Sequence, residues 1–152
     1  HDGERVSSTR IRQAIRDGNM PAAAAMLGRD YTVLGTVVEG RKLGRQLGFP
    51  TANLRVHNEQ LPPNGVWAVD VTLEDKSVYR GAGNLGVRPT VENGEERKML
   101  EINLLDFQGD LYGHDVEVRF VRRVRDERKF NSLEDLKAQI RKDVELCRVA
   151  EI

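Results

Sequence analysis

Between residues 31 and 121, short strand-like stretches alternate with glycine, asparagine and acidic turns, and no helical pattern separates them. In Val66–Leu73, apolar residues occupy every second position, as on a strand with one buried face. Strands this closely spaced pair antiparallel, because parallel pairs need long crossovers. The sequence therefore predicts a mainly β barrel or sandwich, and a closed barrel would also remove unpaired edges. The predicted strands are Tyr31–Val38, Thr51–Val56, Val66–Leu73, Val78–Leu85, Met99–Phe107 and Val116–Val121.

The first 30 residues differ in texture and predict two short helices. Possible N-caps at Ser7–Thr9 precede the first helix, and Gly18 offers its end. Pro21 begins a second, alanine-rich helix, which Gly28 ends. Such a pair is too small to bury a core of its own, so we expect a short appendage to the β domain.

The last predicted element is an amphipathic helix that packs on the strands. Ser132 can cap it together with Asp135. Apolar residues follow at helical spacing, namely Leu133, Leu136, Ile140, Val144 and Cys147. Cys147 on this stripe indicates a small core residue rather than a reactive thiol. Before this helix, the Gln108–Asp110 turn predicts a hairpin between the last two strands.

The charge balance limits the partners that the chain attracts. Lys plus Arg and Asp plus Glu each number 24 in 152 residues, so no net field favours nucleic acid or an anionic membrane. The single cysteine excludes an intrachain disulfide, and no Cys/His set has zinc-site spacing. Without a run of roughly 20 apolar residues or a signal-peptide core, we expect a cytoplasmic protein. A first residue other than Met suggests a fragment or a processed chain.

The most distinctive loop is Gly44–Leu54, with the sequence GRQLGFPTANL. Its two glycines permit positive φ and close approach to a ligand, and Pro50 fixes the turn that follows. Thr51 and Asn53 leave the same face of an extended chain, and their neutral oxygens could serve a metal ion and a phosphate chain. The plainer alternative is a turn whose backbone these two side chains satisfy.

Two further segments contain candidate functional groups. Gly81–Thr90 combines glycines with Asn, Arg and Thr, and is either a strand ending in a turn or a wall of a ligand site. Glu101 shares an outward strand face with Asn103. It is either a solvated carboxylate or, beside a substrate proton, a general base. Neither glycine run is a P-loop or a Rossmann fingerprint, which argues against the common nucleotide folds.

A basic run extends from Arg119 to Lys129 and is interrupted by Asp126 and Glu127. On a small barrel, such a run could bind single-stranded nucleic acid. Base stacking needs aromatic side chains, and only Phe120 and Phe130 lie near this run. A solvated surface is therefore the better interpretation, and no nucleic-acid partner is expected.

Together these segments resemble the riboflavin kinase family. Gly44–Asn53 is similar to its Gly-Arg-x-Leu-Gly-Phe-Pro-Thr-Ala-Asn signature, Asn84–Thr90 to its second loop, and Glu101–Gly113 to its catalytic-strand segment. The resemblance covers residues 31–148 in the right order. Residues 6–29 resemble the end of the adenylyltransferase module of bacterial bifunctional riboflavin kinase/FAD synthetases. The His-x-Gly-His nucleotide motif of that module is absent from this sequence.

The resemblance implies a six-stranded antiparallel Greek-key barrel with a C-terminal helix over residues 31–152, preceded by a helical remnant over residues 1–30. It implies transfer of the γ-phosphoryl group of ATP to the 5′-hydroxyl of riboflavin, giving FMN and ADP, with Mg²⁺ or another divalent ion. With the rest of the adenylyltransferase module missing, we expect no FAD synthesis. The zero net charge and the lack of a long apolar run lead us to expect no membrane partner. The alternative is a nonenzymatic barrel that binds flavin or single-stranded nucleic acid.

The resemblance also implies roles for particular residues. Glu101 would accept the proton of the ribityl hydroxyl, while Thr51 and Asn53 would bind the divalent ion. The implied nucleotide and phosphate contacts are Lys42, Gly44, Arg45, Gly48, Phe49, Thr51 and Asn53. The implied flavin contacts are Asn84, Arg88 and Arg128. Asn103 stands where many relatives have His, which leaves the role of Glu101 intact, and Ser7–Arg12 is expected to be structural.

Overall fold

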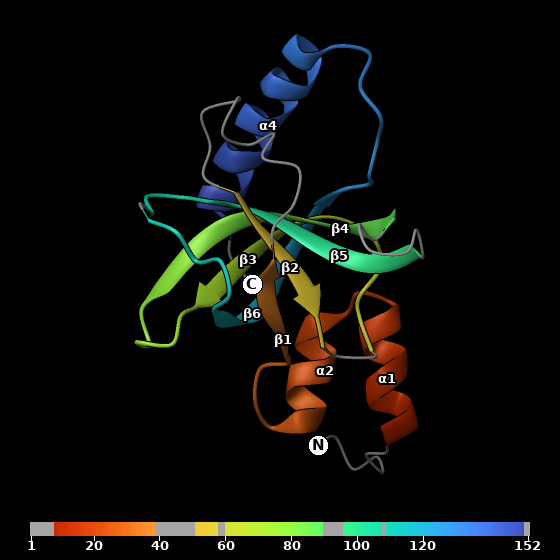
Figure 1. Cartoon of the computed structure of the whole chain (residues 1–152). Coiled ribbons are helices and arrows are strands. Elements are labelled where there is room, and N and C mark those ends of the chain that lie inside the picture. Colours follow the sequence, from red (N-terminus) through yellow and green to blue (C-terminus); the bar gives the residue numbers. More distant parts are fainter. Residues whose placement is uncertain (1–7, 39–50, 58–59, 90–95, 108, 151–152) are drawn as a thin grey trace.

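The chain forms a closed antiparallel barrel with helices at two opposite ends (Figure 1). The computed structural model describes residues 8–38, 51–57, 60–89, 96–107 and 109–150, without the side chains of residues 88–89 and 96–97. All six predicted strands are present, and the sandwich alternative is wrong. The strands are β1 (Thr32–Val38), β2 (Thr51–Val56), β3 (Gly65–Thr72), β4 (Val78–Pro89), β5 (Glu96–Leu104) and β6 (Asp115–Arg125).

The strands follow the order β1-β2-β5-β4-β3-β6 around the barrel. β3, β4 and β5 are consecutive neighbours and β6 returns to lie beside β3, which is a Greek-key arrangement. The predicted hairpin between β5 and β6 is therefore wrong, because β5 pairs with β2 and β4 and has no edge left for β6. The connection instead reaches β1, where the Gly113 N–H donates to the Val37 carbonyl (2.8 Å) and the Val37 N–H donates to the His114 carbonyl (2.9 Å). Gln108, in the predicted turn, lies outside the described residues.

The barrel interior is filled by the alternate residues that the sequence pattern predicts to be buried. Trp67, Val69 and Val71 on β3 are each at most 1% exposed. The Trp67 ring packs edge-to-face on Phe120, with ring centroids 5.3 Å apart. Full burial of a large apolar side chain contributes roughly 1.5–3 kcal/mol, so this interior supplies most of the driving force for closing the barrel.

The glycines of β4 make room for this interior. A Cβ atom on Gly81 would lie 2.5 Å from Cγ2 of Ile102, and one on Gly83 would lie 3.1 Å from Cδ1 of Leu100. The glycine run is thus a strand that continues to Pro89, rather than one that ends in a turn. Because side chains alternate along a strand, the inward glycines leave Asn84 on the outer face.

The two predicted N-terminal helices are confirmed as α1 (Ser8–Arg16) and α2 (Met20–Leu27). Asn19, which the sequence reasoning overlooked, caps α2 by accepting a hydrogen bond from the Ala22 N–H (3.2 Å). Gly28 ends α2 in the left-handed conformation, with φ of 76°. The buried residues of this pair form a small cluster of their own, made of Ala14, Ile15 and Ala23.

The terminal helix, α4 (Leu133–Arg148), is capped as predicted, with the Ser132 hydroxyl accepting from the Asp135 N–H at 3.1 Å. Val144 and Cys147 pack against outward residues of the barrel, in a second core of Ala68, Ala82, Leu105, Val121, Val144, Cys147 and Ala150. Burial raises the pKa of the Cys147 thiol to about 12, so the thiol stays protonated and inert. In the part of the chain that the structure describes, no helix is long and apolar enough to cross a membrane.

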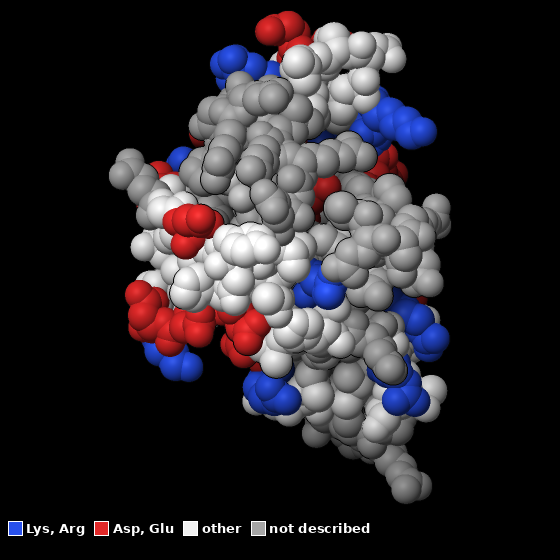
Figure 2. All heavy atoms as spheres, in the orientation of Figure 1, with Lys and Arg blue, Asp and Glu red and all other residues white. Residues whose placement is uncertain are grey.

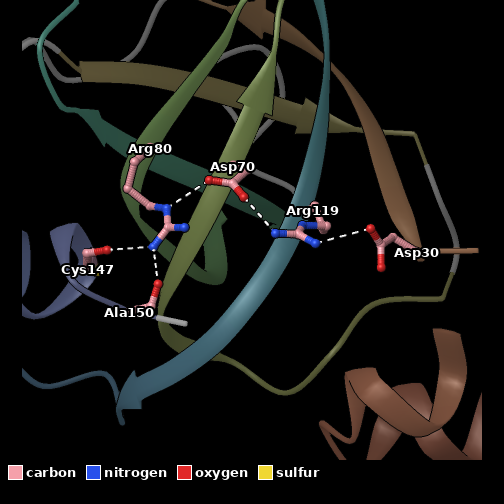
Figure 3. Close-up of polar contacts among 6 residues, drawn as sticks. All are labelled: Asp30, Asp70, Arg80, Arg119, Cys147 and Ala150. Atoms are coloured by element: carbon pink, nitrogen blue, oxygen red, sulfur yellow. Dashed lines mark hydrogen bonds and ion pairs between the residues drawn. The ribbon is translucent and has the colours of Figure 1, made fainter. Parts of the chain in front are cut away.

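A chain of ion pairs connects both helical ends to the barrel (Figure 3). Asp70 on β3 accepts from Arg80 Nε on β4 (2.7 Å) and from Arg119 Nη2 on β6 (2.8 Å). Arg119 Nη1 also donates to Asp30, which follows α2, at 3.1 Å. Arg80 Nη1 donates to two backbone carbonyls at the C-terminal end of α4, at 2.8 and 2.6 Å. These bonds supply donors to carbonyl groups where the helix ends and hold that end against the barrel.

Candidate active site

Three of the polar residues predicted for the site lie on neighbouring strands of the outer face. Glu101 on β5 is directly opposite Asn53 on β2 and Asn84 on β4. Leu100 and Ile102, on either side of Glu101, are fully buried in the barrel, so alternation turns Glu101 outward. Directly opposed antiparallel residues have Cβ atoms about 4.5–5.5 Å apart. The fold therefore brings the predicted base beside one predicted metal ligand and one predicted flavin contact. Asn53, Glu101 and Asn84 form the first polar row.

A second polar row lies two residues further along the same face. Thr51 on β2 is directly opposite Asn103 on β5, and the Thr51 hydroxyl donates a hydrogen bond to Asn103 Oδ1 at 3.1 Å. Like Asn53 and Glu101, both side chains are half-buried. The two rows place a hydroxyl, two carboxamides and a carboxylate on two neighbouring strands. These side chains are partly shielded from water, so electrostatic interactions among them are stronger than in bulk water.

Asn84 holds a buried acceptor at the end of the first row. Its Oδ1 is inaccessible to solvent and has no hydrogen-bond partner among the described residues. A buried carbonyl oxygen left unpaired costs roughly 1–3 kcal/mol, so it favours a ligand that brings a donor. Because Asn84 is next to Glu101, that donor would lie close to the carboxylate.

The first row continues across β3 to a buried ion pair with α4. Asn84 is opposite Val66, which is opposite Arg125 on β6. Arg125 donates to both carboxylate oxygens of Asp143 on α4, from Nε at 2.9 Å and from Nη2 at 2.8 Å. Gln139 Nε2 donates to the same carboxylate at 3.0 Å. Asp143 is only 3% exposed, so this pair fixes the middle of α4 beside the row.

Arg128, a predicted flavin contact, precedes α4 and is exposed. Its guanidinium lies 4.7 Å from the centre of the Phe130 ring, and Nη1 is 3.5 Å from Gln139 Oε1. The Arg125 guanidinium approaches the same ring at 5.7 Å. Arg128 is thus connected to the polar row through Gln139, Asp143 and Arg125.

The other predicted site residues fall outside the described part of the chain. These are Lys42, Gly44, Arg45, Gly48 and Phe49. Arg88 lies on β4, but its side chain is also outside the description. The nucleotide contacts of the glycine loop and the flavin contact of Arg88 therefore stay predictions.

The donors of the two rows suit a hard cation. Mg²⁺ takes a few protein oxygens and keeps waters or substrate phosphates, and the Thr51 hydroxyl and the Asn53 amide are oxygen donors of this kind. Within the described residues, no three His, Cys, Asp or Glu side chains are grouped to hold a metal ion. A hydroxyl and carboxamides are hard oxygen donors, which fit Mg²⁺ bound together with phosphates, whereas zinc and softer metals take Cys and His ligands.

The basic run on β6 is used largely within the molecule. Arg119 pairs with two aspartates, Arg123 with Asp126, and Arg125 with Asp143. On the face shown in Figure 2, basic and acidic residues are interspersed, and the described residues form no continuous basic surface there. Arg122, Arg123, Arg128 and Lys129 are exposed, which agrees with the predicted solvated surface, while Arg119 and Arg125 are held in ion pairs within the molecule.

A cavity of about 440 Å³ lies elsewhere, between the N-terminal helices and the barrel. Its lining residues are Gly18, Met20, Pro21, Trp67, Val121, Arg122 and Arg123. None of the residues predicted for the site is among them. The polar rows on β2, β5 and β4, rather than this cavity, are therefore the candidate active site.

Two features of the site were missed from the sequence. Asp143 lies between Ile140 and Val144 on the apolar stripe of α4, and a charge in that position needs a buried partner, which is a signal that could have found it. The contact between Asn103 and Thr51 left no local signal, because it depends on the pairing of β2 with β5.

Several bifunctional riboflavin kinase/FMN adenylyltransferases are similar to this chain. The protein of Haemophilus influenzae is 46% identical over 147 residues, which are 97% of this chain and 47% of that protein. The protein of Escherichia coli K12 is 43% identical over 141 residues, or 93% of this chain and 44% of that protein. The chain thus spans about half the length of the curated relatives it matches.

Solved structures and a family model agree with this similarity. A crystal structure of a protein described as a macrolide-efflux protein, from Streptococcus pneumoniae, is 39% identical with a TM-score of 0.84, covering 98% of this chain and 48% of that one. A riboflavin kinase from Trypanosoma brucei is 29% identical with a TM-score of 0.54, covering 77% of this chain and 76% of that one. The Flavokinase family model, described as riboflavin kinase, matches residues 27–150. The chain belongs to the riboflavin kinase family.

Proposed function

We propose that this chain transfers the γ-phosphoryl group of ATP to the 5′-hydroxyl of riboflavin, giving FMN and ADP. The observation that supports this most directly is the row of Asn53, Glu101 and Asn84, in which a carboxylate lies between two amides in a member of the riboflavin kinase family. Phosphoryl transfer depends on positioning and charge neutralisation more than on covalent chemistry. A rigid barrel face with closely spaced oxygen donors is suited to that task.

Glu101 is the proposed general base. As the riboflavin hydroxyl oxygen bonds to the γ-phosphorus, the bond to the β-phosphate oxygen breaks, ADP leaves, and the hydroxyl proton passes to the Glu101 carboxylate. A positioned base typically contributes about 10²–10⁴-fold to the rate. The buried Leu100 and Ile102 on either side hold this strand in register and so fix the direction of the carboxylate.

Thr51 and Asn53 are the proposed ligands of Mg²⁺ and the phosphates. The bound ion would neutralise the negative charge of the phosphates, as a hard cation does in other phosphotransferases. Lys42, Gly44, Arg45, Gly48 and Phe49 are proposed to complete the nucleotide site. For residues 44–53 the proposal rests on the family signature, and Lys42, two residues before it, is proposed to offset phosphate charge.

The flavin is proposed to bind at the other end of the row, toward α4. Asn84 offers a buried oxygen that lacks a partner among the described residues, and a ribityl hydroxyl could donate to it. Arg88 and Arg128 are proposed to border the flavin. The Arg125–Asp143 pair supports this arrangement, because it holds α4 beside the row and Gln139 links it to Arg128.

We further propose that residues 31–152 form the kinase domain and residues 1–30 are the end of an adenylyltransferase module. On this view the chain makes FMN without FAD, and it works in the cytoplasm. An incubation with riboflavin, ATP and Mg²⁺, followed by chromatography for FMN and FAD, tests the kinase activity and the division into modules. Absence of FMN would count against the kinase, and appearance of FAD would count against the division into modules.

Glu101→Gln tests the base within the same assay. We expect turnover to fall about 10²–10⁴-fold while Mg²⁺·ADP still binds. Glu117→Gln is the matched control, because Glu117 is an outward, exposed glutamate on β6, away from the row. An unchanged rate in Glu101→Gln would remove this residue from the mechanism. Riboflavin binding without ATP-dependent conversion would instead favour the nonenzymatic alternative.

A further inference from the structure

We infer that Asn103 is a positioning residue that orients the hydroxyl group of Thr51 toward the cation. This inference rests on the proposed function, in which Thr51 is a ligand of the Mg²⁺–phosphate group. The observation behind it is the hydrogen bond from Thr51 Oγ1 to Asn103 Oδ1, 3.1 Å long, between directly opposed residues of β2 and β5.

The direction of this hydrogen bond decides what the hydroxyl presents to a ligand. A threonine hydroxyl has one hydrogen and two lone pairs. When the hydrogen points to Asn103, the lone pairs are directed to the remaining sides of the oxygen, where a cation needs them. A hydroxyl that turned its hydrogen toward the ion would oppose binding. An amide oxygen suits the acceptor role because it takes the hydrogen without adding a negative charge near the phosphates.

Both side chains are held in place by their surroundings. Thr51 is β-branched, which restricts its χ1 rotamers. Asn103 lies between Thr51 and Ala82, its opposite residue on β4, and Ala82 is 3% exposed in the core under α4. Because Ala82 has no polar side-chain atom, it offers no competing partner on that side. The half-buried position of the pair also limits competition from water.

A double-mutant cycle separates positioning from a general structural effect. Binding of ADP with Mg²⁺ is measured by calorimetry for the wild type, Asn103→Ala, Thr51→Val and the double variant. We expect Asn103→Ala to weaken binding about threefold to tenfold, as for one lost hydrogen bond. In the Thr51→Val background, the same change should have little further effect, because the hydroxyl that it orients is gone. Equal losses in both backgrounds would overturn the inference.

Steady-state kinetics supplies a second readout. Asn103→Ala should raise KM for Mg²⁺·ATP and leave KM for riboflavin unchanged, whereas a distorted barrel would raise both. Thr72→Val is the control for Thr51→Val, because it makes the same isosteric change on the outer face of β3. It should leave nucleotide binding unchanged. If Asn103→Ala does not fold, Asn103→Ser carries the same expectation, because its hydroxyl is too short to reach Thr51.

The outcomes for the inference and for the proposed function are distinct. A wild-type chain that forms FMN but gives an additive cycle overturns the role of Asn103 alone. A wild-type chain that binds Mg²⁺·ADP with a non-additive cycle, but forms no FMN, supports Asn103 and overturns the kinase. Failure of the wild type to bind Mg²⁺·ADP overturns both.

Discussion

Replacing Asp143 with asparagine should destabilise the protein far more than the same change at an exposed ion pair. Of the charged residues that the structure describes, Asp143 alone is buried. It accepts two hydrogen bonds from Arg125 and one from Gln139. The asparagine side chain would keep one acceptor oxygen but would turn an NH₂ group toward the guanidinium, which has only donors. Arg125, 18% exposed, would be left with a buried charge and no anionic partner at this position.

The size of the effect follows from this burial. Breaking a buried ion pair from one side costs about 3–5 kcal/mol. Arg125 still donates to the Asp126 carbonyl at 2.9 Å, so the lower end, about 3 kcal/mol, is expected. In a domain of this size, each kcal/mol lowers Tm by about 2–4 °C, which gives a loss of about 6–12 °C. With a urea m-value near 2 kcal/mol/M, the midpoint should fall by about 1.5 M.

Fluorescence of Trp67 provides the assay. It is the only tryptophan in the chain and is 1% exposed, so unfolding changes its surroundings completely. Asp106→Asn is the control, because Asp106 pairs with Arg148 at 2.9 Å but both side chains are largely exposed, at 76% and 44%. That change should cost less than about 1 kcal/mol. A loss for Asp143→Asn no larger than the control would refute the view that the buried pair fixes α4.

Three further predictions concern the barrel, the ion-pair network and the cysteine. Gly81→Ala should destabilise the fold by about 1–3 kcal/mol in urea titrations, because its Cβ would overlap Cγ2 of Ile102, and adding Ile102→Leu, which lacks that methyl group, should recover part of the loss. Asp70→Asn removes the negative charge between two arginines and one of the two oxygens that they bind, so hydrogen exchange in the last turn of α4 should accelerate while exchange in its first turns stays unchanged. Cys147 should resist a thiol reagent at pH 8 until the protein unfolds in urea, and rapid labelling of the native protein would contradict its burial. Since burial raises its pKa from 9.0 to about 12, its contribution to stability is fully present below pH 9 and is lost as pH rises toward 12, and Cys147→Ala should lack that loss.

Much of the fold could be predicted because the relevant signals are local. Alternation of apolar residues is a property of each strand, so the pattern in Val66–Leu73 identified its buried face correctly. Caps, Pro21 and glycine stops identified the three helices that the structure describes, with Ser132 at the start of α4 confirmed. The hairpin at Gln108–Asp110 was predicted wrongly because a turn signal shows that the chain bends and not which strand comes next to which.

For the candidate site, the sequence identified the chemical groups and tertiary structure decided their neighbours. Thr51, Asn53, Asn84 and Glu101 could be named from motifs, and alternation alone placed Glu101 on the outer face. Their proximity depends on β5 lying between β2 and β4, which are far apart in the sequence. That order comes from closing the barrel over a shared core, which is a non-local balance of burial and strand pairing. Alternation along a strand is local and can be read from the chain, whereas the order of strands is decided only when the whole barrel closes.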